Sequence, residues 1–158
     1  MANTYTQIHL HIVFAVKYRE CLINRSWSEE LYKYITGIVQ NNNHKMLAIN
    51  GMPDHVHLLI GMRPAQSISD LLNYIKSNSA KWINEKKILK ERFQWQEGYG
   101  AFSCSKSHMK NVIEYIENQE KHHQKHTFKE EYIDCLKKQE IEFEEKYIFK
   151  ELLSFNRQ

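Results

Sequence analysis

The chain has 158 residues, which is enough for one domain with a buried core and too few for two comfortable ones. Its 22 basic and 19 acidic residues leave a formal charge of only +3, a weak argument for nucleic acid as a partner. Three scattered cysteines without a CxxC pair argue against a disulfide framework or a zinc ribbon and favour a reducing compartment. No charged and then apolar leader opens the chain, and its apolar runs are too short to cross a membrane, so we expect a cytoplasmic protein.

The first expected elements are a strand over 8–18 and a helix that ends near Asn42. Every second residue of the strand is apolar and points to one face, and the other face carries His9, His11, Val13 and Ala15. Ser26 or Ser28 can cap the helix, in which apolar residues recur at helical spacing until a run of three asparagines breaks it.

A hairpin follows, with strands over 45–50 and 55–62 and a turn at Gly51-Met52-Pro53-Asp54. His55 and His57 begin its second strand, and because side chains alternate they project from one face. Two imidazoles there are a candidate metal clamp, although two half-exposed polar residues give the same pattern. The similar pair His9 and His11 is assigned to structure or DNA contact. Because the two strands are expected to be adjacent, His11 is also a candidate to hold a metal-binding histidine in place without binding the metal.

The next expected helix begins at Ser67, with Asp70 three residues on, and ends near Lys86-Lys87. Extended segments over 93–96 and 100–105 come after it. The resulting order β-α-β-β-α-β predicts an α+β fold with a ferredoxin-like antiparallel sheet, in which the first and third strands are adjacent and central.

An amphipathic helix over 109–126 is added to this unit and carries Tyr115 and Gln119. Because they are four residues apart, the hydroxyl and the amide can point at one small volume. A phenol beside a metal is a candidate nucleophile, whereas a tyrosine in an apolar stripe is more often part of a core. His122 and His123 fall roughly on the same face, and we interpret them as solvated or in contact with phosphate rather than as metal ligands.

The charged segment over 127–158 is interpreted as a helix with a solvated face, and the alternative is a mobile tail or dimer arm. Its charged residues separate five apolar ones, which are Ile133, Leu136, Ile141, Phe143 and Ile148.

Three segments together resemble one family: PDHVHLLIG at 53–61, WQEGYGAFSCS at 95–105 and YIENQEKHH at 115–123. In content, order and approximate spacing they are similar to the small single-tyrosine HUH transposases of insertion sequences and their REP-associated relatives. The resemblance runs over 8–147, and Val56 fills the bulky apolar position between the two histidines. It implies an HUH catalytic domain over 1–126, with 127–158 as a charged helical extension of the same domain.

The resemblance also implies a mechanism. Tyr115 attacks a DNA phosphate to form a 5′-phosphotyrosine, while His55, His57 and Gln119 hold Mg²⁺ or Mn²⁺. The expected substrate is single-stranded DNA, with hairpins at the ends of the element, and the expected assembly is a homodimer. Ligand types alone favour zinc or a late transition metal over magnesium, so the residue types and the resemblance disagree on the identity of the metal.

Contacts to DNA are expected from four basic residues, Lys17, Arg19, Lys106 and Lys110, and from stacking by Trp95, Tyr99 and Phe102. Two other functions remain as alternatives: a non-catalytic single-stranded nucleic-acid binding module, and a metal-dependent phosphodiesterase that uses water. A trapped covalent adduct between protein and DNA would distinguish all three.

Overall fold

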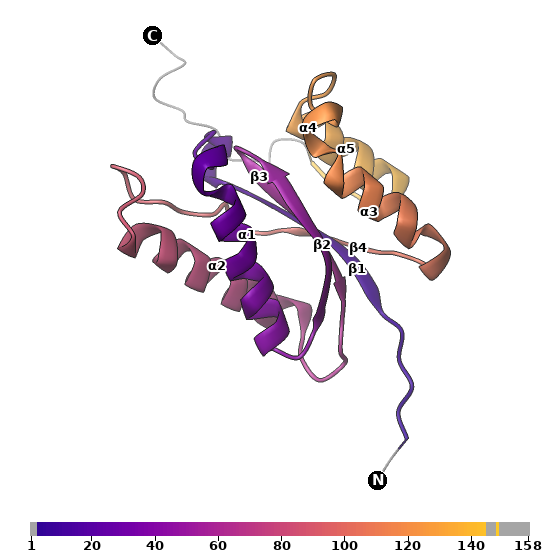
Figure 1. Cartoon of the computed structure of the whole chain (residues 1–158). Helices are drawn as coiled ribbons and strands as arrows, with labels where there is room; N and C mark the ends of the chain where they lie inside the picture. The colour runs from indigo at the N-terminus through magenta and orange to yellow at the C-terminus, as the bar shows by residue number, and fades with distance from the viewer. Residues whose placement is uncertain (1–2, 145–147, 149–158) are drawn as a thin grey trace.

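The computed structural model describes residues 3–144 and 148 and contains an antiparallel sheet in the order β2-β3-β1-β4 (Figure 1). The strands are β1 (His9–Ala15), β2 (Lys45–Met52), β3 (His55–Gly61) and β4 (Gly100–Ser103). The helices α1 (Arg25–Asn41) and α2 (Ile68–Glu85) complete a β-α-β-β-α-β unit. The predicted ferredoxin-like topology is confirmed, with β1 and β3 adjacent at the centre.

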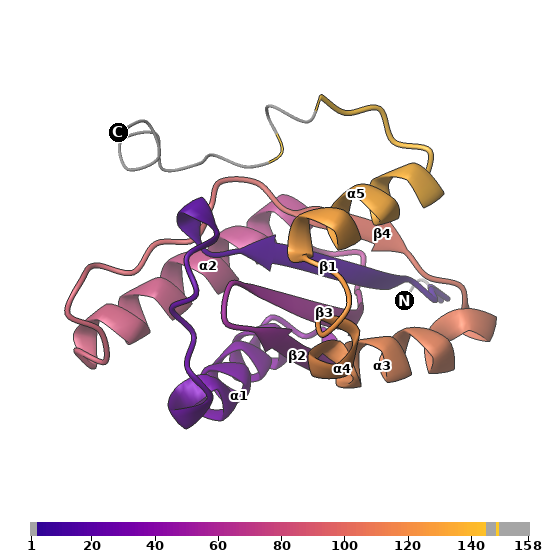
Figure 2. The ribbon, with the colours of Figure 1, turned by 90° about the horizontal axis from the view of Figure 1, so that it is seen from above.

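Within the described residues, three further α-helices follow β4 and lie on the opposite face of the sheet from α1 and α2 (Figure 1). They are α3 (Met109–Glu117), α4 (Gln119–His122) and α5 (Phe128–Lys138). In Figure 2, α5 lies over β1 and β4, whereas α3 and α4 lie beside β2 and β3. Side chains that project from the middle of this face are therefore flanked by two groups of helices.

The alternation predicted for β1 separates two cores. Leu10, Ile12, Phe14 and the following Val16 are buried in the main cluster under α1 and α2. Val13 and Ala15 instead pack with residues of α5 and β4. Each of the two central strands thus buries both of its faces, one in an apolar core and one under the added helices.

Helix ends differ from the predictions at two places. Asn24, rather than Ser26 or Ser28, caps α1, since its side chain accepts a hydrogen bond from the Ser26 amide. The helix predicted as continuous over 109–126 is wrong, because it breaks at Asn118, whose φ of −99° and ψ of 24° are not helical. The cap at Ser67 is as predicted, since it accepts from the Asp70 amide.

The C-terminal segment is described as far as 144, and at 148. Its helix α5 is amphipathic: Phe128 and Leu136 are buried against the sheet, and most of its charged side chains face outward. The predicted boundary near 126 stays a prediction, and 145–147 and 149–158 of the predicted extension lie outside the described residues. Among the described residues, no helix has the length and apolar character needed to cross a bilayer.

Candidate metal and tyrosine site

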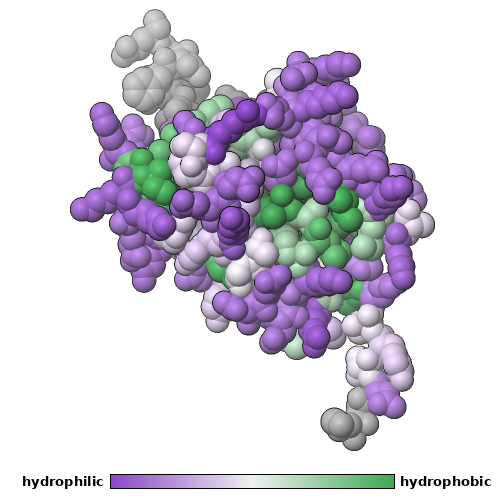
Figure 3. Space-filling model, in the orientation of Figure 1, coloured by the Kyte–Doolittle hydropathy of each residue, from purple (hydrophilic) through white to green (hydrophobic). Residues whose placement is uncertain are grey.

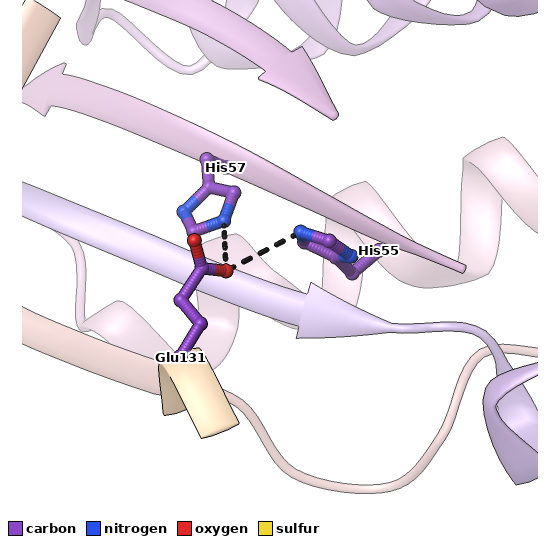
Figure 4. Close-up of side chains that lie close together, drawn as sticks. All are labelled: His55, His57 and Glu131. Carbon is purple, nitrogen blue, oxygen red and sulfur yellow. Dashed lines mark hydrogen bonds and ion pairs between the residues drawn. The ribbon is translucent and has the colours of Figure 1, made fainter. Parts of the chain in front are cut away.

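The two histidines of β3 project from one face of the sheet and are completely buried. The Nε2 atom of His57 lies 3.0 Å from Oε1 of Glu131, and that of His55 lies 3.4 Å from the same oxygen (Figure 4). On its other side, Nδ1 of His55 lies 2.7 Å from Oδ1 of Asp54, in the turn that begins the strand. The Pro53-Asp54 turn therefore orients the first imidazole as well as connecting the hairpin.

His11 on the neighbouring strand β1 orients the second imidazole. Its Nε2 lies 2.8 Å from Nδ1 of His57, and the two rings are stacked with centroids 5.1 Å apart. The pairing of β1 with β3 sets Val13 directly opposite His57, so His11 is its diagonal neighbour on the same face. His9 lies half-buried at the start of β1.

Tyr115 and Gln119 reach the same volume from the far side of the site, although the helix breaks between them. Oε1 of Gln119 lies 3.1 Å from Nε2 of His55, and its Nε2 lies 3.3 Å from Oε2 of Glu131. The Tyr115 hydroxyl donates a hydrogen bond to that same Oε2. The structure thus brings together the four residues predicted as nucleophile and metal ligands.

Glu131 was not anticipated, because it lies in the charged segment interpreted as a solvated helix face. It is 5% exposed and lies in the first turn of α5, where the helix dipole favours a negative charge. The one signal in the sequence is its spacing, since it falls on the same helical face as buried Phe128 and near Leu136.

His122 and His123 also point at Glu131, which corrects our interpretation of them as solvated, whereas contact with phosphate stays a prediction. Nε2 of His122 lies 3.2 Å from Oε2, and Nε2 of His123 lies 3.3 Å from Oε1. Both Nε2 atoms are buried and have no hydrogen bond to a described residue. The short helix α4 after the break at Asn118 turns both rings inward, and the prediction of one continuous helix missed this.

Burial fixes the charge state of most of these groups. It lowers the pKa of His57 to about 3 and that of His11 to about 4, so both imidazoles are neutral at pH 7. Burial also opposes charge on His55, but hydrogen bonds to Asp54 and Glu131 outweigh it and raise its pKa.

The acidic groups are affected in opposite directions. Burial disfavours ionised Glu131, but its close polar contacts with the imidazoles of His123, His55 and His57 outweigh this and hold its pKa well below the usual range. Burial and the charge of Glu131 raise the pKa of Tyr115 far above its usual value, so the phenol is protonated. One buried carboxylate beside the two buried imidazoles of β3 is a donor set suited to a divalent cation.

The four predicted phosphate contacts do not converge. Lys17 and Arg19 form a 3₁₀ turn after the C-terminal end of β1, and Lys17 donates a hydrogen bond to Gln94. Lys106 and Lys110 lie near the opposite end of β1, just beyond the Cys104 amide that donates to the His9 carbonyl.

Two of the three aromatic residues expected to stack on bases are structural instead. Trp95 is buried beside Phe14 and Phe93, and its Nε1 donates to the Ser79 hydroxyl. Phe102 is 4% exposed in the cluster under α5. Tyr99 is half-buried, and its hydroxyl hydrogen-bonds to that of Ser69.

Comparison with known proteins shows clear relatives. The family described as "Transposase IS200 like" matches residues 4–119. The ISDra2 transposase TnpA of Deinococcus radiodurans is 29% identical over 118 residues, which cover 72% of this chain and 84% of that protein. The transposase for insertion sequence element IS200 of Salmonella typhimurium is 27% identical over 124 residues, with coverage of 75% and 81%.

Solved structures agree with the fold. A crystal structure of a candidate transposase from Deinococcus radiodurans gives a TM-score of 0.62 at 27% identity and covers 75% of this chain and 95% of that one. A REP-associated tyrosine transposase bound to a REP hairpin gives a TM-score of 0.59 at 14% identity, with coverage of 78% and 73%. The second likeness shows the fold alone.

Asn50 of β2 provides a test of how the tyrosine helix is held. Its side-chain amide donates to the carbonyls of Ile116 and Glu117, 3.0 and 3.2 Å away, at the point where α3 ends. Asn50→Ala should lower the free energy of unfolding by about 1 kcal/mol and speed amide exchange in α3 and α4. Urea unfolding and hydrogen exchange measure both effects. The control is Asn78→Ala, whose amide donates to the Tyr74 carbonyl within α2, and equal exchange in α3 for the two variants would contradict this coupling.

Proposed function

Because this chain belongs to the IS200-like transposase family, we propose that it cleaves and rejoins single-stranded DNA through a covalent bond between Tyr115 and a 5′-phosphate. The observation that carries the proposal is the convergence of one hydroxyl with two imidazole nitrogens and an amide oxygen. The hydroxyl of Tyr115 and Oε1 of Gln119 come from adjoining helices. The hydroxyl donates to Glu131, whose other oxygen lies beside the histidines of β3, and the Gln119 oxygen lies 3.1 Å from Nε2 of His55. A nucleophile beside a set of cation ligands suits phosphoryl transfer.

The residues present fit a divalent cation, for which the resemblance implies Mg²⁺ or Mn²⁺. Nε2 of His55, Nε2 of His57 and Oε1 of Gln119 would hold it. Asp54 and His11 are hydrogen-bond partners of the Nδ1 atoms of His55 and His57, respectively. Such a second partner fixes the tautomer and orientation of a metal-binding imidazole. A cation bound here would neutralise charge on the non-bridging oxygens of the scissile phosphate.

Tyr115 supplies the nucleophilic oxygen. Its bond to phosphorus forms as the bond from phosphorus to the 3′ oxygen breaks, which leaves a free 3′-hydroxyl and keeps the 5′-phosphate on the protein. The hydroxyl must lose its proton in this step, and in the free protein its hydrogen bond goes to a carboxylate. Attack by the 3′-hydroxyl of another strand on the phosphotyrosine then restores the tyrosine, so joining needs no nucleotide cofactor.

Hairpins at the ends of the element are the substrate we propose, and the REP hairpin bound by one structural relative supports this choice. Lys17, Arg19, Lys106 and Lys110 are proposed contacts to phosphate. A homodimer is the proposed assembly. Figure 3 shows hydrophobic side chains gathered over the exposed edge of the sheet at β2, between α1 and α3, which is compatible with a second copy there.

Tyr115→Phe tests the nucleophile. The variant keeps the packed ring and loses only the attacking oxygen, so cleavage of a single-stranded hairpin oligonucleotide should fall by at least about a thousandfold. Binding of the oligonucleotide should stay within about twofold, because base and phosphate contacts remain. Denaturing gels report cleavage and the covalent adduct, and Tyr34→Phe on the opposite face of the sheet is the control. Cleavage without any adduct in the unmodified protein would instead favour the phosphodiesterase that uses water.

His57→Ala tests the cation site against the earlier histidine pair. Removal of one buried imidazole should weaken Mn²⁺ binding, measured by calorimetry, by at least about tenfold and reduce cleavage in parallel. His9→Ala, which removes a half-buried imidazole at the start of β1, should leave Mn²⁺ affinity unchanged. Equal losses in the two variants would show that the ligands have been assigned to the wrong pair.

A further inference from the structure

We propose that His122, His123 and Glu131 form a second cation site, separate from the one at β3, which takes Zn²⁺ or a similar transition-metal ion. The cation of the proposed function uses other ligands, the two histidines of β3 and Gln119, so the two sites share no ligand. All three residues of the second site lie beyond residue 119, where the family match ends, and the second site does not depend on the proposed function.

The first support is the spacing of the three donor groups. Nε2 of His122 lies 3.2 Å from Oε2 of Glu131, and Nε2 of His123 lies 3.3 Å from Oε1. One donor atom from each of the three residues lies within 4.8 Å of the other two. Atoms bound about 2.1 Å from one cation are about 3.0 Å apart in octahedral geometry and about 3.4 Å apart in tetrahedral geometry. The two contacts therefore have the lengths expected between ligands of one ion.

The second support is that both Nε2 atoms lack a hydrogen-bond partner. They are buried and make no hydrogen bond to a described residue, although each lies within ion-pair distance of Glu131. Nε2 of His57, in contrast, is hydrogen-bonded to Oε1 of the same carboxylate, 3.0 Å away. A nitrogen beside a carboxylate oxygen but not aligned for a hydrogen bond is expected where both atoms face a common ion.

The orientation of His123 is fixed by a bond on the other side of its ring. Nδ1 lies 2.8 Å from the carbonyl oxygen of His126, so the ring donates its N–H to the backbone there and Nε2 carries the free lone pair. The side chain is only 7% exposed. A buried imidazole with one nitrogen held and the other unpartnered is the usual state of a metal ligand. The ring of His122 is perpendicular to it, with centroids 5.1 Å apart, so the two rings approach Glu131 from different directions.

The position of Glu131 is fixed by packing. Phe128, one turn earlier on α5, stacks on the ring of His55 with centroids 3.8 Å apart and an angle of 8° between planes. Phe128 and Leu136 are buried against β1 and β4. A docked helix therefore presents the carboxylate to the two histidines, and the site would join α4 to α5.

The ligand types determine the choice of metal. Two imidazoles and one carboxylate are a ligand set of catalytic zinc sites, in which a water or substrate oxygen takes the fourth position. The side chain of His122 is 28% exposed, so solvent can reach this position. Mg²⁺ prefers oxygen ligands and is disfavoured here. The Tyr115 hydroxyl donates to Glu131, and its ring centroid lies 5.1 Å from that of His122, so the second site lies beside the proposed nucleophile.

The test measures binding of Co²⁺, whose visible absorption reports its ligands, to the full chain freed of metal by chelation. The variant His57→Ala, which disables the site at β3, should still bind one Co²⁺ that about a hundredfold excess of Mg²⁺ does not displace. Adding His122→Ala or His123→Ala to this variant should weaken Co²⁺ binding at least about tenfold and change the absorption spectrum. The matched control adds His126→Ala, which removes an exposed imidazole and keeps the carbonyl that holds His123; it should leave Co²⁺ binding unchanged.

The outcomes separate the second site from the proposed function. If His57→Ala binds no Co²⁺, or binds it equally well after His122→Ala and His123→Ala are added, the second site is wrong and the site at β3 is untouched. If His57→Ala alone leaves Co²⁺ binding unchanged and His123→Ala alone abolishes it, the second site stands and the cation site of the proposed function is wrong. Displacement of Co²⁺ by Mg²⁺ would overturn the choice of metal. Should His57→Ala fail to fold by circular dichroism, the number of Co²⁺ ions bound by the unmodified chain and by His123→Ala, two against one, decides.

Discussion

The antiparallel pairing of β1 with β3 is the constraint on which both the fold and the site depend. The register places Val13 opposite His57 and Ala15 opposite His55, and it fixes which side chains share a face. One face of the pair forms the apolar core under α1 and α2. The other face holds His11 against His57, and a shift of one residue in either strand would turn the imidazoles into the core. The apolar packing of one face therefore determines the geometry of the site on the other.

The buried charge of Glu131 is the second constraint. An isolated carboxylate away from water is costly, and the His57 imidazole beside this one is kept neutral by its own burial. The hydroxyl of Tyr115 and the amide of Gln119 satisfy part of its hydrogen-bonding capacity. A divalent cation held by the neighbouring histidines of β3 would supply the missing positive charge. A carboxylate buried at this position therefore requires hydrogen-bond donors or positive charge close to it.

The sequence predicted those parts of the molecule that depend on local periodicity. Alternation identified the strands and the common face of His55 and His57, and the order of elements predicted the neighbours in the sheet. The break at Asn118 was missed because a polar residue on a helix surface does not by itself end a helix, and here Asn50 of a distant strand binds the final carbonyls of α3. Glu131 and Trp95 were misread for a related reason. A charged or aromatic residue is exposed or buried according to which element docks against it, and that is a tertiary property.

The break at Asn118 has a consequence for how the site works. In one continuous helix Tyr115 and Gln119 would move together as a rigid unit. With α3 ending at Glu117 and α4 beginning at Gln119, the nucleophile and the amide ligand lie on separate short helices that meet at one non-helical residue. Both side chains bind the same carboxylate, so Glu131 and the contacts of Asn50 hold the two pieces in register.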